Sequence, residues 1–245
     1  MQFGKIAIIG AGNTAYTLCK VLKSKEIEPF CILVRNPEKA EKVLDSDLAI
    51  IAVNDDAISE VAAHLIDYKG LVVHTSGTKS SEVLNRIERY GVFYLPYTMS
   101  KERNISFDDV PLLIYANSPE DMIRLNGFAE QLSSKVQYCD DEQRKVIHLA
   151  AVYVSNFTNV MLGIGDKLLK KNGLSLDLMR PLVMEMMKKS FEISPEKALT
   201  GPARRGDIQT ILDHEEMLVN SPKELEIYKV LTNYILEKYQ KNEKL

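Results

Sequence analysis

The spacing of hydrophobic residues changes once along the chain, and the change predicts two architectures. Up to about residue 140, short apolar runs alternate with helical or polar stretches, which is typical of strands joined by helices. From Asp141 onwards the apolar residues recur only with a helical period. We therefore expect an α/β domain over residues 1–140 and an all-α domain over residues 141–245. The predicted strands are residues 5–9, 30–34, 48–53, 70–74, 92–95, 112–115 and 135–138.

A glycine pattern follows the first predicted strand. Gly10 suits a tight turn, Gly12 allows a diphosphate to approach the backbone, and Ala15 lets the next helix pack closely on its strand. The free N–H groups and the positive dipole end of that helix would face an anion. A glycine pattern alone is weak evidence, and a simple tight turn is the alternative, but its place between a strand and an amphipathic helix favours a Rossmann-like dinucleotide site. The residues that we assign to the cofactor here are Gly10, Ala11, Gly12, Asn13 and Thr14.

The end of the second predicted strand bears on the choice between NAD and NADP. An acidic residue there would accept the ribose 2′-OH of NAD, whereas an arginine accommodates the 2′-phosphate of NADP. This chain has Arg35 followed by Asn36, and no acid at that point. Arg35 therefore favours NADP, with a solvated loop arginine as the alternative. Asn36 is assigned to the cofactor as well, although it is also a good cap for a helix that starts at Pro37.

Polar residues also follow the third and fourth predicted strands, at the sheet edge where open α/β folds bind ligands. The first of these strands ends at Val53, and Asn54 and Asp55 follow it, where they either line the cofactor or cap the next helix. We assign Val53 and Asn54 to the cofactor site. Thr75-Ser-Gly-Thr78 follows the other, where its hydroxyl groups either meet the cofactor or substrate or cap a helix over residues 81–90. From this segment we assign His74, Ser76 and Gly77 to the cofactor site, with a structural role for His74 as the alternative.

The second domain is predicted to begin with a long helix over residues 142–171. Its middle is apolar on nearly every side, so more than one neighbour should bury it. On a regular helical wheel, His148, Asn156 and Asn159 lie together beside the main apolar face. Buried polar groups need partners. We therefore expect this stripe to be catalytic and to face the cofactor, although a satisfied core histidine is an open alternative.

The remaining predicted helices contain few candidate functional residues. A helix over residues 176–191 contains a methionine cluster, which usually serves packing. The stretch Leu199–Asp207 is predicted to be irregular, and Arg204 and Arg205 there form either an anion site or solvated surface. Asp207 and the Ser221-Pro-Lys-Glu224 capping box each predict a further helix start.

Composition limits the kinds of partner. The net charge is −3, from 31 basic and 34 acidic residues, so no basic footprint for nucleic acid is present. Three distant cysteines, Cys19, Cys31 and Cys139, indicate neither a disulfide framework nor a metal site. The N-terminal apolar run is too short for a signal peptide or a membrane span. We expect a cytoplasmic protein that binds a small molecule, with no metal and no membrane partner, and that forms a homodimer through its C-terminal helices.

Several motifs together resemble a known family. They are Ile8-Ile-Gly-Ala-Gly-Asn-Thr-Ala15, His74-Thr-Ser-Gly-Thr78, residues 142–151, Ser155-Asn-Phe-Thr-Asn159 and residues 200–207. The chain resembles the NADP oxidoreductases that pair a Rossmann-like domain with a helical C-terminal domain of unassigned function. More distantly it is similar to pyrroline-5-carboxylate reductases and to 6-phosphogluconate and β-hydroxyacid dehydrogenases. The resemblance implies a nicotinamide cofactor, a site between the domains and dimerisation through the helices.

One departure from the dehydrogenases concerns the proton donor. Their catalytic lysine lies four residues before an asparagine, but here Val152 precedes Asn156 at that spacing, and Ser155 precedes Asn159. His148 is the remaining titratable residue of the stripe, and its intrinsic pKa of about 6.5 suits proton donation near neutral pH. We therefore expect an NADP-dependent reductase that transfers hydride between NADP(H) and a small carbonyl or imine compound. The alternative is a catalytically inactive dinucleotide-binding sensor.

The assignment of Arg35 leads to a binding prediction. A charge-assisted contact to the 2′-phosphate should make Arg35→Ala weaken NADPH binding about tenfold to a hundredfold. NADH lacks that phosphate, so its affinity should scarcely change. Fluorescence titration with both cofactors checks this, and equal losses for both would contradict it.

Overall fold

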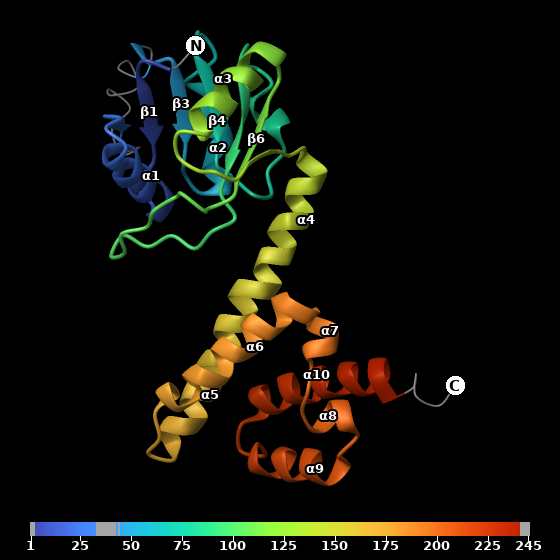
Figure 1. Ribbon diagram of the computed structural model, residues 1–245. Helices are drawn as coiled ribbons and strands as arrows, with labels where there is room; N and C mark the ends of the chain where they lie inside the picture. Colours follow the sequence, from blue (N-terminus) through green and yellow to red (C-terminus); the bar gives the residue numbers. More distant parts are fainter. Residues whose placement is uncertain (1–2, 33–42, 44, 241–245) are drawn as a thin grey trace. The chain divides into compact units, whose positions relative to one another are not determined.

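The computed structural model describes residues 3–32, 43 and 45–240 (Figure 1). The chain folds into two compact units, Met1–Asn156 and Phe157–Leu245. The first unit thus contains the whole sheet and the first turns of the long helix. Arg35 and Asn36, assigned above to the cofactor, lie outside the described residues.

The described part of the first unit contains a seven-stranded sheet in the order β2-β1-β3-β4-β5-β6-β7. Neighbouring strands are parallel except for β5 and β6, which are antiparallel. Ile8 in the middle of β1 pairs with Cys31 on one side and Ile50 on the other. The predicted fold class is confirmed. The strands are β1 Ile6–Ile9, β2 Phe30–Ile32, β3 Leu48–Ile51, β4 Leu71–His74, β5 Tyr90–Tyr94, β6 Leu112–Ala116 and β7 Val136–Tyr138.

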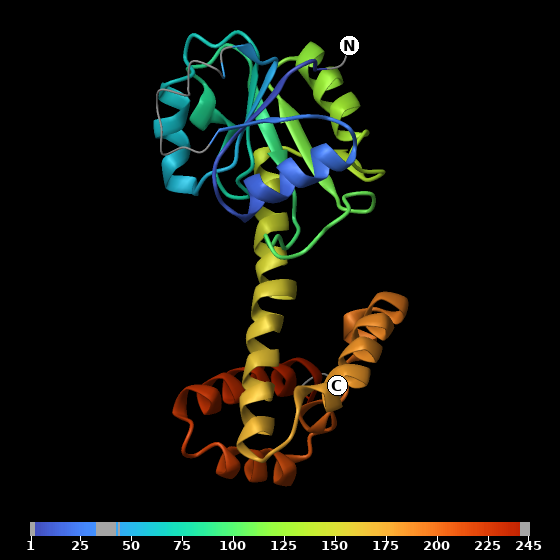
Figure 2. The ribbon, with the colours of Figure 1, turned by 90° about the vertical axis from the view of Figure 1, so that its left-hand side faces the viewer.

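Helices cover both faces of this sheet, which explains why the strands are almost wholly apolar (Figure 2). Side chains alternate between the two faces of a strand. Ile6 and Ile8 of β1 pack in the same core as α1 (Asn13–Ser24) and α3 (Pro119–Ala129). Ala7 and Ile9 belong to a second core with α2 (Ile58–Ala63), which follows the short 3-10 helix η2 (Asp55–Ala57).

Two local predictions for the first unit are corrected. The predicted helix over residues 81–90 is only a short 3-10 helix, η3 (Ser81–Leu84). Arg89 lies outside any helix, since its carbonyl accepts from Val72 N of β4 and its guanidinium pairs with Asp121 of α3. One cysteine also differs from expectation, since Cys19 is disulfide-bonded; Cys139 is a free, buried thiol, in agreement with the absence of a disulfide expected from the sequence.

The long helix that begins the helical part is not regular throughout. It consists of α4 (Asp141–Ala151), a π-helical segment η4 (Val152–Phe157) and α5 (Thr158–Lys171). A capping box starts it, because the Asp140 side chain accepts from Gln143 N and the Gln143 side chain accepts from Asp140 N. By length and composition alone, Asp141–Lys171 could also cross a membrane. The regular wheel used to group His148 with Asn156 and Asn159 does not hold across η4.

The second unit is helical in its described part. After α5 come η5 Leu176–Met179, α6 Arg180–Ile193, α7 Pro195–Ala198, α8 Pro202–Arg205, α9 Ile208–Met217 and α10 Pro222–Gln240. Asp207 caps α9 as predicted, since its side chain accepts from Thr210 N at 3.2 Å. Arg204 and Arg205 lie in α8 rather than in an irregular loop, and the Arg204 guanidinium lies 4.5 Å from the ring centroid of Tyr239.

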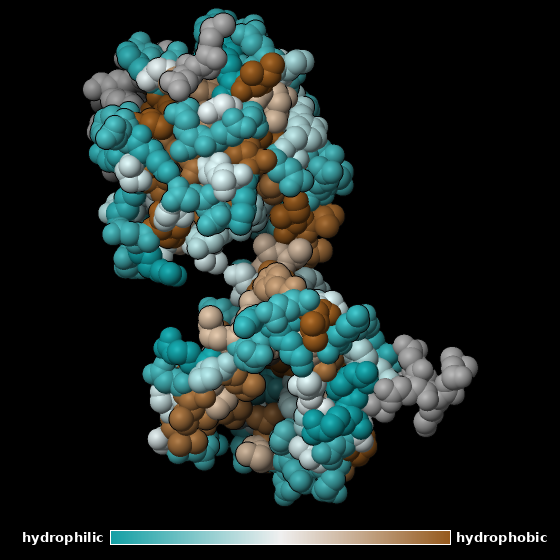
Figure 3. Space-filling model, viewed as in Figure 1, coloured by the Kyte–Doolittle hydropathy of each residue, from teal (hydrophilic) through white to brown (hydrophobic). Residues whose placement is uncertain are grey.

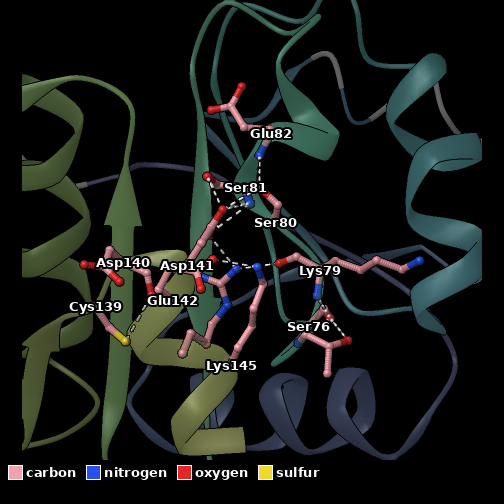
Figure 4. A network of polar contacts seen from close by, with 12 residues as sticks. Ser76, Lys79, Ser80, Ser81, Glu82, Cys139, Asp140, Asp141, Glu142 and Lys145 are labelled. Carbon is pink, nitrogen blue, oxygen red and sulfur yellow. Dashed lines mark hydrogen bonds and ion pairs between the residues drawn. The ribbon is translucent and has the colours of Figure 1, made fainter.

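Hydrogen bonds from an ion pair within α4 join this helix to the loop that follows β4 (Figure 4). Arg144 is fully buried, and its Nη2 donates to Asp141 Oδ1 at 2.7 Å and to the Lys79 carbonyl at 2.5 Å. The Asp141 carboxylate also accepts from Ser80 Oγ and from Ser81 N. Burial would raise the pKa of Asp141, but the hydrogen bonds from Ser80 and Arg144 outweigh it and hold this pKa below its usual value. The network fixes the start of α4 against the sheet.

His74 lies at the end of β4 beside this network, and it is fully buried. Its Nδ1 accepts from Ser76 N at 3.1 Å, which holds the first turn of the loop. Burial, together with the nearby positive charge of Arg144, lowers the pKa of His74 to about 4. His74 is therefore neutral at physiological pH and serves the loop structure.

The buried His74 predicts a pH dependence of stability. In the unfolded chain its pKa should lie at about 6.5, so the unfolded state takes up the proton first as the pH falls. Stability should be complete above about pH 6.5 and should decrease towards pH 4, by about 2 kcal/mol between pH 7.5 and pH 5 for this group alone. Urea unfolding at several pH values measures the slope.

The matched variants separate His74 from the other histidines. His74→Gln should flatten the pH dependence over this range, whatever its effect on stability at pH 7.5. The control, His64→Gln, replaces an exposed side chain and should keep the wild-type slope. An unchanged slope in His74→Gln would contradict the assignment.

Candidate active site

The strand order places a crevice at the carboxyl ends of β1 and β3. The connection from β1 leads to β2 on one side and the connection from β3 leads to β4 on the other, and ligands of open α/β sheets bind at such a switch point. Gly10 leaves β1 with a φ of 150°. A Cβ atom at Gly10 would lie 2.1 Å from the Ala52 carbonyl oxygen, so only glycine allows the turn to pack against the end of β3.

The start of α1 fits an anionic group. Its N-cap is Gly12, which provides no side-chain cap, and the first turn contains no acidic residue. A Cβ atom at Gly12 would meet nothing within 4 Å, so the backbone there faces open space. The N–H groups of the first turn are therefore available to a phosphate or diphosphate, which is the group that this turn binds in dinucleotide folds.

A cavity of about 670 Å³ opens beside this turn, at the same edge of the sheet. The carboxyl ends of β3, β4 and β5 and the C-terminal part of α4 line it, so it lies wholly within the first unit. It contains seven of the residues assigned from the sequence. These are Thr14, Val53, Asn54, Ser76, Gly77, His148 and Asn156.

His148 meets Tyr94 in the wall of this cavity. Its Nδ1 lies 3.1 Å from the Tyr94 hydroxyl, and the two rings are 6.1 Å apart between centroids. A Cβ atom at Gly77 would lie 2.5 Å from His148 Nδ1, so the absence of a side chain at Gly77 makes room for the imidazole. Burial raises the pKa of Tyr94, although the charge of Arg144 opposes this, and the phenol is protonated at neutral pH.

Hydrogen bonds shape the loop that follows β4. The Ser76 hydroxyl accepts from Thr78 N and Lys79 N at 3.1 and 2.9 Å. The Thr78 hydroxyl donates to Asp55 Oδ2 at 2.6 Å, which links the ends of β3 and β4. Ser76 therefore faces the cavity with its hydroxyl oxygen already engaged by the backbone.

Other residues assigned from the sequence lie outside the cavity lining. Gly10, Ala11, Gly12 and Asn13 form the turn beside it. His74 is buried behind the loop rather than in the wall, as its hydrogen bond to Ser76 N explains. Asn159 belongs to the second unit. Within residues 3–32, 43 and 45–240, no group of three or more metal-ligating side chains is present.

The sequence interpretation missed several residues of the wall. Tyr94 and the segment Tyr97–Met99 line the cavity from the end of β5, and Val152 and Ser155 line it from η4. Tyr94 could have been found, because the rule that selected the ends of the third and fourth strands applies to the fifth as well. The residues of η4 could not, because no pattern in the sequence marks a π-helical turn.

Comparisons with known proteins agree with this fold. A family model described as a domain of unknown function, DUF2520, matches residues 110–235. A solved structure described as a "putative NADP oxidoreductase" from Bacteroides fragilis is 36% identical, covers 95% of this chain and 98% of that chain, and has a TM-score of 0.87. A search of curated proteins gave no match.

Two more distant structures support the fold alone. A protein from Thermotoga maritima is 21% identical and covers 98% of this chain and 100% of that chain, with a TM-score of 0.70. A reductive aminase from Aspergillus terreus, solved with NADPH and ethyl levulinate, is 14% identical and covers 97% and 94% of the two chains, with a TM-score of 0.66. The family model spans about half of the 245 residues, and the Bacteroides protein matches nearly all of them. The resemblance inferred from the sequence motifs is confirmed, and the chain belongs to the DUF2520 family.

Proposed function

We propose that the protein is an NADP-dependent oxidoreductase that transfers hydride between NADP(H) and a small carbonyl or imine compound. The observation that carries this proposal is the pair of Tyr94 and His148 in a cavity that also receives the first turn of α1. A proton donor and a dinucleotide-binding turn are the two parts that such a reduction needs at one place. The 36% identical relative, described as an NADP oxidoreductase, supports the same cofactor.

The residues present fit the cofactor. The open backbone at Gly12 and the uncapped first turn of α1 suit the diphosphate, and Val53, Asn54, Ser76 and Gly77 follow neighbouring strands at the same edge. When bound, NADPH supplies the hydride. Arg35 and Asn36 complete the proposed cofactor residues, with Arg35 at the 2′-phosphate.

The proton would come from His148. As a general acid the imidazole must carry a proton on both ring nitrogens, so Nδ1–H donates to the Tyr94 hydroxyl oxygen and Nε2–H is left for the substrate. The Nε2 proton passes to the carbonyl oxygen or imine nitrogen of the substrate, while the adjacent carbon gains the hydride, and a neutral imidazole remains. Tyr94 thus orients the ring. Asn156 would hold the substrate by hydrogen bonds, and the same role is proposed for Asn159.

The inactive sensor is less well supported. The sensor was suggested by Val152, which stands where related dehydrogenases have a catalytic lysine. Val152 indeed lines the cavity with an apolar side chain. However, a site that only senses a dinucleotide has no need of a buried phenol paired with an imidazole, because such a pair costs desolvation. Tyr94 and His148 therefore favour catalysis.

The proton-donor assignment predicts a loss of turnover. His148→Gln and Asn156→Ala should each lower kcat by about a hundredfold, the loss typical of one well-placed polar group, and should leave the NADPH dissociation constant nearly unchanged. Single-turnover oxidation of NADPH with a panel of small cyclic imines and ketones measures this. The control, Tyr97→Phe, removes a hydroxyl from the same wall and should retain activity, since Tyr97 is half exposed.

Two outcomes would count against the assignment. If the wild-type protein binds NADPH but oxidises it with no member of the panel, the sensor becomes the better proposal. If His148→Gln keeps the wild-type kcat and pH profile, the proton comes from another group.

We also propose a homodimer formed by the helical unit, which would carry substrate binding and dimerisation. Among its described residues only Ala203, Ile211, Leu218 and Thr232 are buried. Apolar side chains surround a hollow of about 360 Å³ between α5, α9 and α10 (Figure 3). On α6, Leu182, Met184 and Phe191 are exposed, and Phe191 is 87% exposed. Monomeric proteins rarely leave so much apolar surface uncovered, so a second copy is expected to bury it.

The dimer predicts a mass twice that of the 27.7 kDa chain at micromolar concentration. A charge at the apolar surface of α6, introduced as Phe191→Glu, should shift the equilibrium to monomer, because burying an unpaired carboxylate is costly. The control, Lys188→Glu, makes a comparable change at an exposed position of the same helix and should remain dimeric. Sedimentation equilibrium measures both, and a wild-type monomer would contradict the proposal.

The expected cellular location and partners follow from the sequence composition and from the proposed dimer. We propose a soluble, cytoplasmic protein without nucleic-acid or membrane partners, in which the apolar surface of the helical unit serves the dimer. Binding of the purified dimer to lipid vesicles would contradict this.

A further inference from the structure

The connection between β5 and β6 is longer than its two strands require. These strands are antiparallel neighbours, so a short hairpin could join them. Instead residues 95–111 leave the sheet and run past α1 (Figure 1). Lys20 of α1 donates to the Lys101 carbonyl and to Asn104 Oδ1, both at 3.2 Å. Lys25 pairs with Asp108 at 2.7 Å. Contacts with α1 therefore hold this connection in place.

The connection brings a cation to the glycine turn. Lys101 Nζ donates to the Ala11 carbonyl at 2.9 Å, and Ala11 lies between Gly10 and Gly12. An ammonium group has three donors, so hydrogen bonds remain for a ligand. In the part of the chain that the structure describes, no carboxylate lies within ion-pair distance of Lys101. The cation thus stands beside the uncapped start of α1 with its charge uncompensated.

We propose that Lys101 binds the diphosphate of the dinucleotide, as a contact carried by the β5–β6 connection. The inference rests on the proposed function, since it places a cofactor at the turn. The helix dipole and the ammonium attract the same anion, and a charge-assisted hydrogen bond is stronger than a neutral one. A lysine is a suitable partner for this group, because its flexible stem places a point charge without fixed geometry.

The position of Ala11 identifies the part of the cofactor. The turn between β1 and α1 meets the diphosphate in Rossmann-like folds, whereas the 2′-phosphate lies beyond the end of β2. Lys101 should therefore stabilise NADPH and NADH alike. It should also stabilise ADP-ribose, which has the diphosphate but neither the nicotinamide nor the 2′-phosphate. In this respect it differs from Arg35, whose proposed contact concerns NADPH alone.

The test compares three ligands with one variant. Lys101→Gln should weaken the binding of NADPH, NADH and ADP-ribose by a similar factor, about tenfold, as measured by calorimetry at low salt. Lys101→Arg keeps the charge and should recover most of the affinity. The control is Lys25→Gln, which removes the same charge from a lysine that also contacts the connection, through Asp108 at the far end of α1. Its affinities should stay at the wild-type values.

The outcomes separate this inference from the proposed function. Unchanged affinities in Lys101→Gln, or a loss confined to NADPH, would overturn the diphosphate contact while leaving the cofactor in place. An equal loss in Lys25→Gln would also overturn it, since the effect would then come from the connection as a whole. A wild-type protein that binds none of the three ligands would overturn the proposed function together with this inference.

Discussion

The arrangement of the candidate site depends on one buried charge. Arg144 has no exposed surface, and its Nε and Nη1 atoms have no hydrogen-bond partner among the described residues. Such a group is tolerated only because Asp141 and the Lys79 carbonyl compensate it, and losing one partner of a buried pair is strongly destabilising. Hydrogen bonds of this pair with residues 79–81 tie α4 to the loop after β4. His148 lies one helical turn beyond Arg144, so the same contact sets the position of the imidazole against Gly77.

Much of the fold could be predicted because the sheet is covered on both faces. Buried parallel strands are continuous apolar runs, and such runs mark most strands of the described sheet, whereas β7 is short and largely exposed. The rule that ligands bind at the carboxyl ends of strands then selected Asn54, Ser76 and Gly77, which line the cavity, without any knowledge of packing. The same rule would have selected Tyr94, had it been applied to the fifth strand. The turn at Gly10 could likewise be predicted from the sequence. Ala52 approaches so closely that no Cβ atom fits there, so the position requires glycine.

The predictions and the structure differ where tertiary contacts override local preference. The sequence of residues 85–89 favours a helix, but the pairing of Arg89 with Asp121 and the hydrogen bond from Val72 N to the Arg89 carbonyl prevent the helix from continuing. His74 stands at a strand end like Ser76, but it is buried behind the loop and accepts from Ser76 N, so its assignment to the cofactor stays a prediction. The grouping of Asn159 with His148 assumed a uniform helical period, and nothing in the residues between them indicates the wider turns of η4. Such turns depend on packing around the helix, which a single sequence does not display.

The π-helical segment has a consequence for how this protein can vary. A π turn accommodates about one residue more than an α turn of the same height, so it shifts the phase of every side chain that follows it. Removing one residue from Val152–Phe157 would restore a regular helix and rotate α5 about its axis, with no substitution in α4 or α5. The number of residues in this segment thus sets which face α5 presents, without any change in the residues of α5 itself. The face that carries His148 can be conserved while the apolar surface of α5 turns independently, which allows the two to change at different rates among relatives.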